Sequence, residues 1–231
     1  KFIVIVNPNN PTGNVAKPST IMEVLSIAKD WPNCTIIADE IYDALDFSGD
    51  QRSVASLSDE VPVVTLNGVS KVHFAPGWRI GYMAFFDPKS TLQAPRDGAE
   101  RILRSRLCAS TPAQYGYLAG LNHDRLWLKE RLRTIERRVD LCMNRIEGIE
   151  GLSCNKPGGA FYLFPKIDNP SKYGSDKKFV LDLLHEEHVL VVHGSGFSPR
   201  YGSGHFRLVA LAPEDLLNEA FDRIDRFVRS R

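Results

Sequence analysis

Three short apolar runs constrain the fold of this chain more than any other feature, because each has the length and composition of a buried strand. They are Phe2–Val6, Thr35–Ala38 and Val61–Leu66. Between the first two, the stretch from Pro18 to Trp31 has apolar residues at helical spacing and a proline near its start. A helix that connects consecutive strands is typical of parallel pairing. The sequence therefore predicts an α/β fold with a mostly parallel sheet.

A polar side chain follows each of these runs. Asn10 comes after the first, Asp39 and Tyr42 after the second, and Lys71 after the third. Open α/β sheets bind their ligands at the carboxyl ends of the strands. We therefore expect these side chains to line a pocket at one edge of the sheet.

Lys71 is followed eight residues later by Arg79, at the start of another strand-like run, Ile80–Phe86. The residues between them form a turn that contains Pro76 and Gly77. An amine can bond to an aldehyde, and a guanidinium can hold a phosphate at two points. The pair suits a cofactor that has both groups, although lysine and arginine near a turn are more often solvated surface charges.

Four motifs occur in a fixed order: Asn7–Gly13 (NPNNPTG), Ala38–Tyr42 (ADEIY), Ser70–Tyr82 (SKVHFAPGWRIGY) and Phe206–Leu208 (FRL). Together they resemble the class I/II aminotransferases, pyridoxal 5'-phosphate (PLP) enzymes of fold type I. The resemblance runs from Lys1 to Arg231, and within the family it is greatest to the alanine (glutamate–pyruvate) aminotransferases. It implies part of the mostly parallel sheet of the large domain, followed by a C-terminal α+β small domain.

The resemblance implies a role for each residue of the cofactor site. Lys71 would form a Schiff base with the cofactor and move a proton during catalysis. Asp39 would pair with the protonated pyridine nitrogen. Tyr42 and Asn10 would donate hydrogen bonds to the phenolic oxygen of the ring, and Arg79 would bind the phosphate.

The resemblance also implies a substrate site, in which Arg207 binds the α-carboxylate of the substrate as a bidentate pair and Asn10 lies beside it. The expected reaction moves an amino group between an L-amino acid, alanine or aspartate, and 2-oxoglutarate. One position departs from the family pattern. Many relatives have serine or threonine three residues before the lysine, where this chain has Gly68, so one phosphate hydrogen bond is in doubt.

Each of these residues has a simpler alternative when it is considered alone. Asp39 and Glu40 could cap a helix that follows the strand. Tyr42 could be an ordinary core residue, and Asn10 a turn residue. Arg207 could be a surface arginine on an edge strand. The joint occurrence of the motifs in order favours the functional interpretation.

Two other functional classes remain open. One is the aminotransferase-like effector domain of a transcriptional regulator, which binds the cofactor without turnover. The other is a fragment that is inactive as isolated, because members of the family are longer. On this interpretation the chain is the carboxyl-terminal portion of an aminotransferase. Such a piece, made on its own, is expected to self-associate or to need a partner segment, and to bind PLP weakly.

The second half of the sequence has a different pattern of elements. A long amphipathic helix is predicted for Asp124–Glu147, with arginines that form either a solvated face or a dimer contact. It is followed by the strand Ala160–Phe164, the helix Lys177–His188, the strands Val189–His193 and His205–Ala210, and a helix from Pro213. We therefore expect two domains, 1–123 (the cofactor-binding part) and 124–231 (the interdomain helix and the small domain).

Composition limits the possible partners. With 43% apolar residues and a formal net charge of +1, the chain gives no reason to expect nucleic acid or a membrane as partner. The four cysteines are scattered, which favours reduced thiols and a cytoplasmic location. A homodimer is implied by the family. The histidines His185 and His188 are not spaced as in a zinc-binding HExxH helix, so no metal is expected.

Overall fold

The structure, a computed structural model, describes residues 1–124 and 126–231 and divides into two compact units. The first unit contains Lys1–Pro8 and Val15–Leu128, and the second contains Asn9–Asn14 and Lys129–Arg231. The predicted boundary at residue 123 lies near the division at Leu128. However, the prediction assigned Asn9–Asn14 to the first domain, whereas the structure groups this loop with the second unit.

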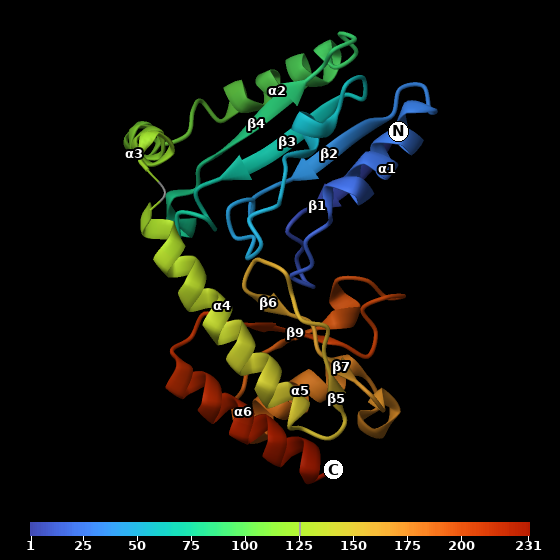
Figure 1. Ribbon diagram of the computed structural model, residues 1–231, viewed down its shortest axis with the longest axis vertical. Helices are drawn as coiled ribbons and strands as arrows, with labels where there is room; N and C mark the ends of the chain where they lie inside the picture. Colours follow the sequence, from blue (N-terminus) through green and yellow to red (C-terminus); the bar gives the residue numbers. More distant parts are fainter. Residues whose placement is uncertain (125) are drawn as a thin grey trace. The chain divides into compact units, whose positions relative to one another are not determined.

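The first unit is built on a four-stranded sheet in the order β1 (Phe2–Val6), β2 (Thr35–Asp39), β3 (Val63–Gly68) and β4 (Gly81–Phe86). β1, β2 and β3 are parallel, and β4 is antiparallel to β3 (Figure 1). The predicted α/β fold with a mostly parallel sheet is confirmed. The connection between β3 and β4 contains a short 3-10 helix and no α-helix of the kind that usually links parallel strands.

Helix α1 (Pro18–Lys29) is the predicted crossover between β1 and β2. Its buried residues Ile21, Leu25 and Ala28 lie on one helical face, since they are spaced by four and three positions. They pack in one cluster with Ile36 of β2 and Val63 of β3. This apolar cluster holds α1 against one face of the sheet.

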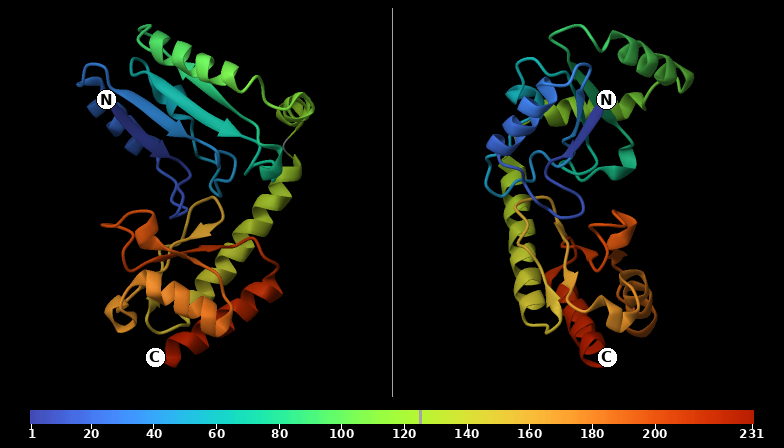
Figure 2. Two further views of the ribbon diagram at one scale, coloured as in Figure 1. Left: turned by 180° about the vertical axis from the view of Figure 1, so that it is seen from behind. Right: turned by 90° about the vertical axis from the view of Figure 1, so that its right-hand side faces the viewer.

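The sequence analysis did not predict α2 (Gln93–Ser105), which lies on the opposite face of the sheet from α1 (Figure 2). None of its residues is buried, and Ile102 and Leu103 are exposed. A groove of about 790 Å³ separates α2 from β3 and β4. Helix α3 (Thr111–Asn122) follows α2.

The second unit combines three helices with short antiparallel strands. The helices are α4 (Leu126–Glu147), α5 (Asp176–Glu187) and α6 (Glu214–Arg229). The strands form one sheet, β6 (Tyr162–Leu163), β9 (Phe206–Val209) and β8 (Val192–His193), and one pair, β5 (Leu152–Ser153) with β7 (Lys166–Ile167). The remaining elements are the 3-10 helices Val54–Leu57, Pro76–Trp78, Pro170–Tyr173 and Gly194–Gly196.

Three strands of the second unit are shorter than predicted. β6 and β8 cover only part of Ala160–Phe164 and Val189–His193, because only two residues of each strand pair with β9. β9 itself lacks the first and last residues of the predicted His205–Ala210. The long helix was predicted from Asp124 and begins at Leu126, and Arg125 lies outside the described residues.

Aromatic side chains form the core of the second unit. Phe179 of α5 contacts Phe206 of β9 and Phe227 of α6, with ring centroids 5.4 and 5.3 Å apart. All three rings are almost completely buried. Because burial of an aromatic side chain contributes about 1.5–3 kcal/mol, this cluster joins α5, β9 and α6 into one unit.

Arginines of α4 contact α6 and the segment before it. Arg137 forms an ion pair with Glu214 at 2.7 Å, Arg138 donates to the carbonyl of Leu211 at 2.7 Å, and Arg145 pairs with Asp222. Arg137 is exposed, as the predicted solvated face requires, whereas Arg138 and Arg145 are only partly exposed. Their partners lie more than 70 residues away, so no local pattern could identify them.

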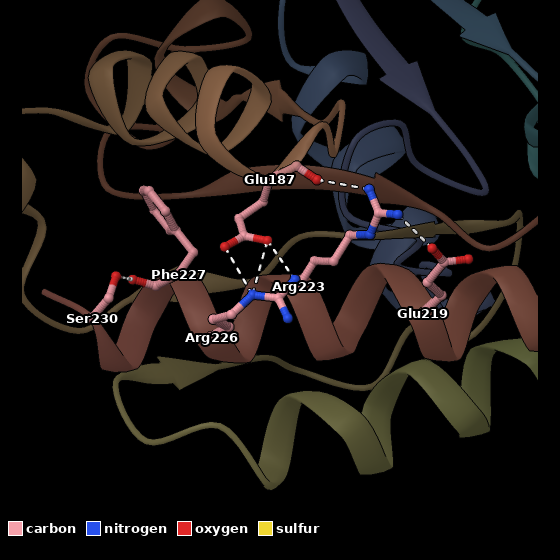
Figure 3. Close-up of polar contacts among 6 residues, drawn as sticks. All are labelled: Glu187, Glu219, Arg223, Arg226, Phe227 and Ser230. Atoms are coloured by element: carbon pink, nitrogen blue, oxygen red, sulfur yellow. Dashed lines mark hydrogen bonds and ion pairs between the residues drawn. The ribbon is translucent and has the colours of Figure 1, made fainter.

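A second set of ion pairs joins α6 to the end of α5. Figure 3 shows Glu187 between Arg223 and Arg226. Arg226 Nη2 is 2.7 Å from Glu187 Oε2, and Arg223 Nη1 donates to the carbonyl of Glu187 at 3.0 Å. Arg223 thereby satisfies one of the carbonyls that a helix end leaves without a partner. These contacts fix the direction in which α6 crosses α5.

No helix in the described part of the chain is long and apolar enough to cross a membrane.

Candidate active site

The carboxyl ends of β1, β2 and β3 form the edge on which most of the predicted cofactor residues lie. Val6, Asp39 and Leu66 are neighbours in register across the three strands. Lys71 follows three residues after the end of β3. Asp39 and Lys71 therefore belong to the same edge of the sheet, as the order of strands and polar residues predicted.

Tyr42 lies between Asp39 and Lys71 in the chain, and its ring lies near the amine of Lys71. Asp39 Oδ1 accepts a hydrogen bond from the N–H of Ile41 at 3.2 Å, which closes the turn after β2. Tyr42 belongs to this turn and is buried. Lys71 Nζ lies 6.0 Å from the centroid of its ring, within the range of a cation–π contact. A carboxylate, a phenol and an amine thus come from two neighbouring strand ends.

The turn after β2 also tests the alternative interpretation of Asp39 and Glu40 as helix-capping residues. Residues 41–44 form a turn and not the start of a helix. The suggestion that Asp39 caps a helix directly after the strand is therefore wrong, whereas Glu40 accepts the first N–H of the later 3-10 helix Val54–Leu57.

The turn from Lys71 to Arg79 is held by buried Val72 and by a few backbone hydrogen bonds. Lys71 is half-buried and its carbonyl accepts from the N–H of Phe74 at 3.2 Å. Arg79 is exposed, has a left-handed backbone (φ 54°), and donates from Nη1 to the carbonyl of Pro76 at 2.9 Å. The two cations therefore lie at the two ends of one structured turn.

Gly68 is paired with Gly81 across β3 and β4. A Cβ atom at Gly68 would lie 2.7 Å from the carbonyl oxygen of Ile80. A side chain at this position would therefore require the two strands to move apart, which gives a packing reason for the glycine that departs from the family pattern.

Glu40 is a buried carboxylate next to Asp39. Its Oε1 accepts hydrogen bonds from the N–H of Val54 at 2.7 Å and the hydroxyl of Ser53 at 3.1 Å. Burial raises the pKa of Glu40 above its ordinary value of 4.5, although these two hydrogen bonds act in the opposite direction. Glu40 thus anchors the segment at Ser53 to the strand end that presents Asp39.

Replacing Glu40 by glutamine should change how stability depends on pH. The pKa of Glu40 is higher in the folded than in the unfolded chain, so the folded protein loses stability as the pH rises from 4.5 through the folded pKa. Glutamine keeps an acceptor for Val54 and Ser53 but cannot ionise. The free energy of unfolding of Glu40→Gln, measured with urea, should therefore increase relative to wild type between pH 4 and 7.

Glu60→Gln is a control in which stability should depend on pH with the opposite sign, because Lys29 and Lys89 lower the pKa of Glu60 to about 2. The ionised Glu60 stabilises the fold above pH 4.5, and this contribution is lost as the pH falls toward 2. A stability difference for Glu40→Gln that did not change with pH would contradict the assignment of a raised pKa.

In the second unit, Arg207 projects from β9 into an aromatic environment. Its guanidinium lies 4.7 Å from the centroid of the Tyr162 ring and 4.9 Å from that of Phe197. Arg207 and Tyr162 share a face of the sheet, because Tyr162 pairs with Val209, two residues further along β9. Arg207 is therefore not a solvated surface arginine on an edge strand: β9 lies between β6 and β8.

Asn10 is the direct polar partner of Arg207. Arg207 Nη1 donates to Asn10 Oδ1 at 2.8 Å. Arg207 Nε is buried and has no hydrogen-bond partner among residues 1–124 and 126–231. A buried N–H without a partner costs about 1–3 kcal/mol, and a carboxylate bound to this side of the guanidinium would remove that cost.

The loop Asn9–Asn14 holds Asn10 in place. Asn9 Oδ1 accepts from the hydroxyl of Thr12 at 2.8 Å, and the carbonyl of Gly13 accepts from the N–H groups of Gly158 and Gly159, each at 3.0 Å. Gly13 has φ +66°, and a Cβ there would lie 2.5 Å from Pro157. The prediction placed Asn10 both with the strand-end residues and beside Arg207; its hydrogen bond to Arg207 and the contacts of its loop place it in the second unit.

Sequence reasoning missed two neighbours of Arg207. Tyr162 and Phe197 could not be assigned to the site because their contact with Arg207 depends on strand pairing and on a loop. A further group, His193, Ser195 and Asp176, resembles a catalytic triad only in composition. His193 Nδ1 lies 3.0 Å from Ser195 Oγ and 4.0 Å from Asp176 Oδ2, so one nitrogen faces both partners and no proton relay through the ring is possible.

Within the described part of the chain, no group of three or more histidine, cysteine, aspartate or glutamate side chains could hold a metal ion.

Comparisons with known proteins agree with these site residues in pointing to one family. The family model described as aminotransferase class I and II matches residues 1–224. Glutamate–pyruvate aminotransferase of Haemophilus influenzae is 39% identical over 99% of this chain and 57% of its own length. Aspartate aminotransferase of Bacillus subtilis is 37% identical over 99% of this chain and 57% of its own length.

Among solved structures, alanine aminotransferase from Pyrococcus furiosus is similar with a TM-score of 0.95 and 47% identity. The similarity covers 100% of this chain and 58% of that protein. The chain thus spans a little over half the length of these relatives.

Proposed function

Because the chain belongs to the class I and II aminotransferases, we propose that the protein moves an amino group between an L-amino acid and a 2-oxo acid. Enzymes of this family depend on PLP, which, when bound, accepts electrons from the bonds around the substrate's Cα. The single observation that supports the proposal best is the placement of Lys71, Asp39 and Tyr42 at neighbouring strand ends.

The chemistry of these side chains fits the cofactor. The amine of Lys71 would hold the aldehyde carbon of PLP and, once displaced by the substrate, would move the proton at the substrate's Cα. Asp39 would keep a proton on the pyridine nitrogen by ion pairing. The hydroxyl of Tyr42 would bind the ring oxygen, and Arg79 the phosphate. Asn10, on the loop beside Arg207, is proposed as a further ligand of the ring oxygen.

Arg207 and Asn10 would orient the substrate. The N–H groups of a guanidinium match the two oxygens of a carboxylate, and Arg207 Nε is a buried donor without a partner among the described residues. Tyr162 and Phe197 restrict the movement of the guanidinium from two sides. An α-carboxylate bound there would be fixed at two points, which also fixes the direction of the Cα–H bond.

The substrates proposed are alanine or aspartate, with 2-oxoglutarate as amino acceptor. Relatives named glutamate–pyruvate and aspartate aminotransferase have similar identities, 39% and 37%, so they support both amino donors. We further propose a cytoplasmic homodimer, in which the first unit is the carboxyl-terminal part of the cofactor-binding domain and the second is the small domain. Formation of pyruvate from alanine, and of oxaloacetate from aspartate, with 2-oxoglutarate tests this proposal directly.

Replacing Asp39 by asparagine tests the role of its charge. Asparagine keeps the acceptor for the N–H of Ile41 but cannot form an ion pair with the ring nitrogen. We expect PLP to remain bound while kcat falls about a hundredfold, or ~2.7 kcal/mol at ~1.4 kcal/mol for each factor of ten. Steady-state turnover together with cofactor content after dialysis measures both effects. Near-normal turnover in Asp39→Asn would mean that the carboxylate only closes the turn.

A further inference from the structure

The turn that carries Lys71 and Arg79 packs against helix α3. Two of its side chains, His73 and Trp78, contact α3 at Gly120 and Gly116. The two glycines are four positions apart and therefore lie on one face of the helix. Figure 1 shows α3 beside the end of the sheet where β3 ends and β4 begins.

The contacts reach the backbone of α3. A Cβ atom at Gly116 would lie 2.6 and 2.9 Å from two ring carbons of Trp78, and one at Gly120 would lie 3.0 and 3.1 Å from the His73 ring. The rings thus occupy the space that a side chain would need. Glycine is less favourable than alanine in the interior of a helix, so two glycines at these positions are explained by the close approach of the rings.

The turn itself needs support from outside. Phe74 and Arg79 both adopt left-handed backbone conformations, with φ of 51° and 54°, which are unfavourable for residues with a Cβ. Such conformations persist where the surrounding structure imposes them. The backbone hydrogen bonds within the turn are long, for example 3.3 Å from the N–H of Ala75 to the carbonyl of Val69.

The face of α3 is in turn tied to the sheet. His73 makes an edge-on contact with Tyr117 at 5.4 Å, and Tyr117 stacks on Tyr82 of β4 at 6.2 Å. The turn is therefore fixed on one side by its connection to β3 and on the other by α3 and β4.

We propose that Gly116 and Gly120 are positioning residues: they let Trp78 and His73 lie against the backbone of α3, which fixes Lys71 and Arg79 in the arrangement that binds PLP. This inference rests on the proposed function, because PLP is the ligand whose aldehyde and phosphate the two cations would hold. Neither glycine would touch the cofactor.

The experiment compares glycine-to-alanine changes in two helices of the same unit. Gly116→Ala pushes against the Trp78 ring, whereas a Cβ at Gly98 of α2 meets no atom within 4 Å, so Gly98→Ala is the matched control. We expect the Kd for PLP, measured by titration of the apoprotein, to increase at least tenfold in Gly116→Ala and to stay unchanged in Gly98→Ala. Gly120→Ala should increase the Kd less than Gly116→Ala, because a Cβ at Gly120 lies slightly further from the His73 ring than a Cβ at Gly116 lies from Trp78.

Trp78→Leu completes the test. The Trp78 side chain is 49% exposed, so this variant should fold even if Gly116→Ala does not, and it should also raise the Kd. Since leucine leaves room for a methyl group, adding Gly116→Ala to Trp78→Leu should change the Kd less than twofold. If Gly116 served only the stability of α3, Gly116→Ala would lower thermal stability in wild type and in Trp78→Leu alike, and its effect on the Kd for PLP would not depend on Trp78.

Two negative results are distinguishable. If wild type binds PLP and both Gly116→Ala and Trp78→Leu bind it equally well, the positioning role is overturned while the proposed function stands. If wild type binds no PLP at all, the proposed function fails and the positioning role fails with it.

Discussion

Replacing Lys71 by alanine is expected to lower kcat for transamination by about 10⁴-fold, the upper range for loss of a positioned acid–base group. The amine is the one group at the strand-end site that can both bond to an aldehyde and move a proton. It lies on the turn after β3, 6.0 Å from the Tyr42 ring, and no other residue of this cluster can replace it. Steady-state turnover measures the loss.

A covalent label identifies the lysine independently of turnover. After reduction with borohydride, the peptide that contains Lys71 should gain the mass of the reduced cofactor, and Lys71→Ala should gain none. Lys89→Ala is the matched control, because Lys89 belongs to the same unit, is exposed and pairs with Glu60 at 2.8 Å. A label on another lysine in wild type would refute the assignment.

Replacing Arg207 by glutamine is expected to lower kcat/KM by about 10²–10⁴-fold, since two charge-assisted hydrogen bonds contribute about 1.5–3 kcal/mol each. Substrate binding should weaken for the amino acid and the 2-oxo acid alike, because both have the carboxylate that Arg207 would hold. Cofactor content should stay the same, because Arg207 is not among the residues proposed to hold PLP. Initial rates at varied concentrations of each substrate measure this effect.

Arg207→Lys separates charge from geometry. Lysine keeps the positive charge but lacks the planar donors and cannot fill the space between Tyr162 and Phe197 in the same way. We therefore expect most of the loss to persist in Arg207→Lys, whereas Arg229→Gln, which replaces an exposed arginine paired with Asp225, should behave as wild type. Full activity of Arg207→Lys would mean that the charge alone is sufficient.

The sequence was enough to predict most of the first unit, because its elements depend on local patterns. β1 occupies the predicted residues Phe2–Val6, and α1 begins at the predicted Pro18. Apolar runs form buried strands, and spacing of three and four residues forms a helix with one apolar face. The order of Asp39, Tyr42 and Lys71 behind these strands then placed them at one edge, since parallel strands end on the same side.

Helix α2 was not predicted, although its sequence has an amphipathic helical pattern, and none of its residues is buried in the fold. The arginines of α4, by contrast, gave no sign of their partners in α6, because the deciding contacts lie outside the helix.

Asn10 shows most clearly what only the tertiary structure decided. Its position after β1 indicated the strand-end site, and the family resemblance also implied a place beside Arg207; in the fold its side chain binds Arg207, 197 residues later in the chain. The place of Asn10 depends on Gly13, whose carbonyl accepts hydrogen bonds from the N–H groups of Gly158 and Gly159. These bonds hold the loop of Asn10 in the second unit. Local sequence determines which elements form and which polar groups end them. Which of these groups meet is determined by packing between distant segments, because the hydrogen bonds and close contacts that decide it exist only in the folded chain.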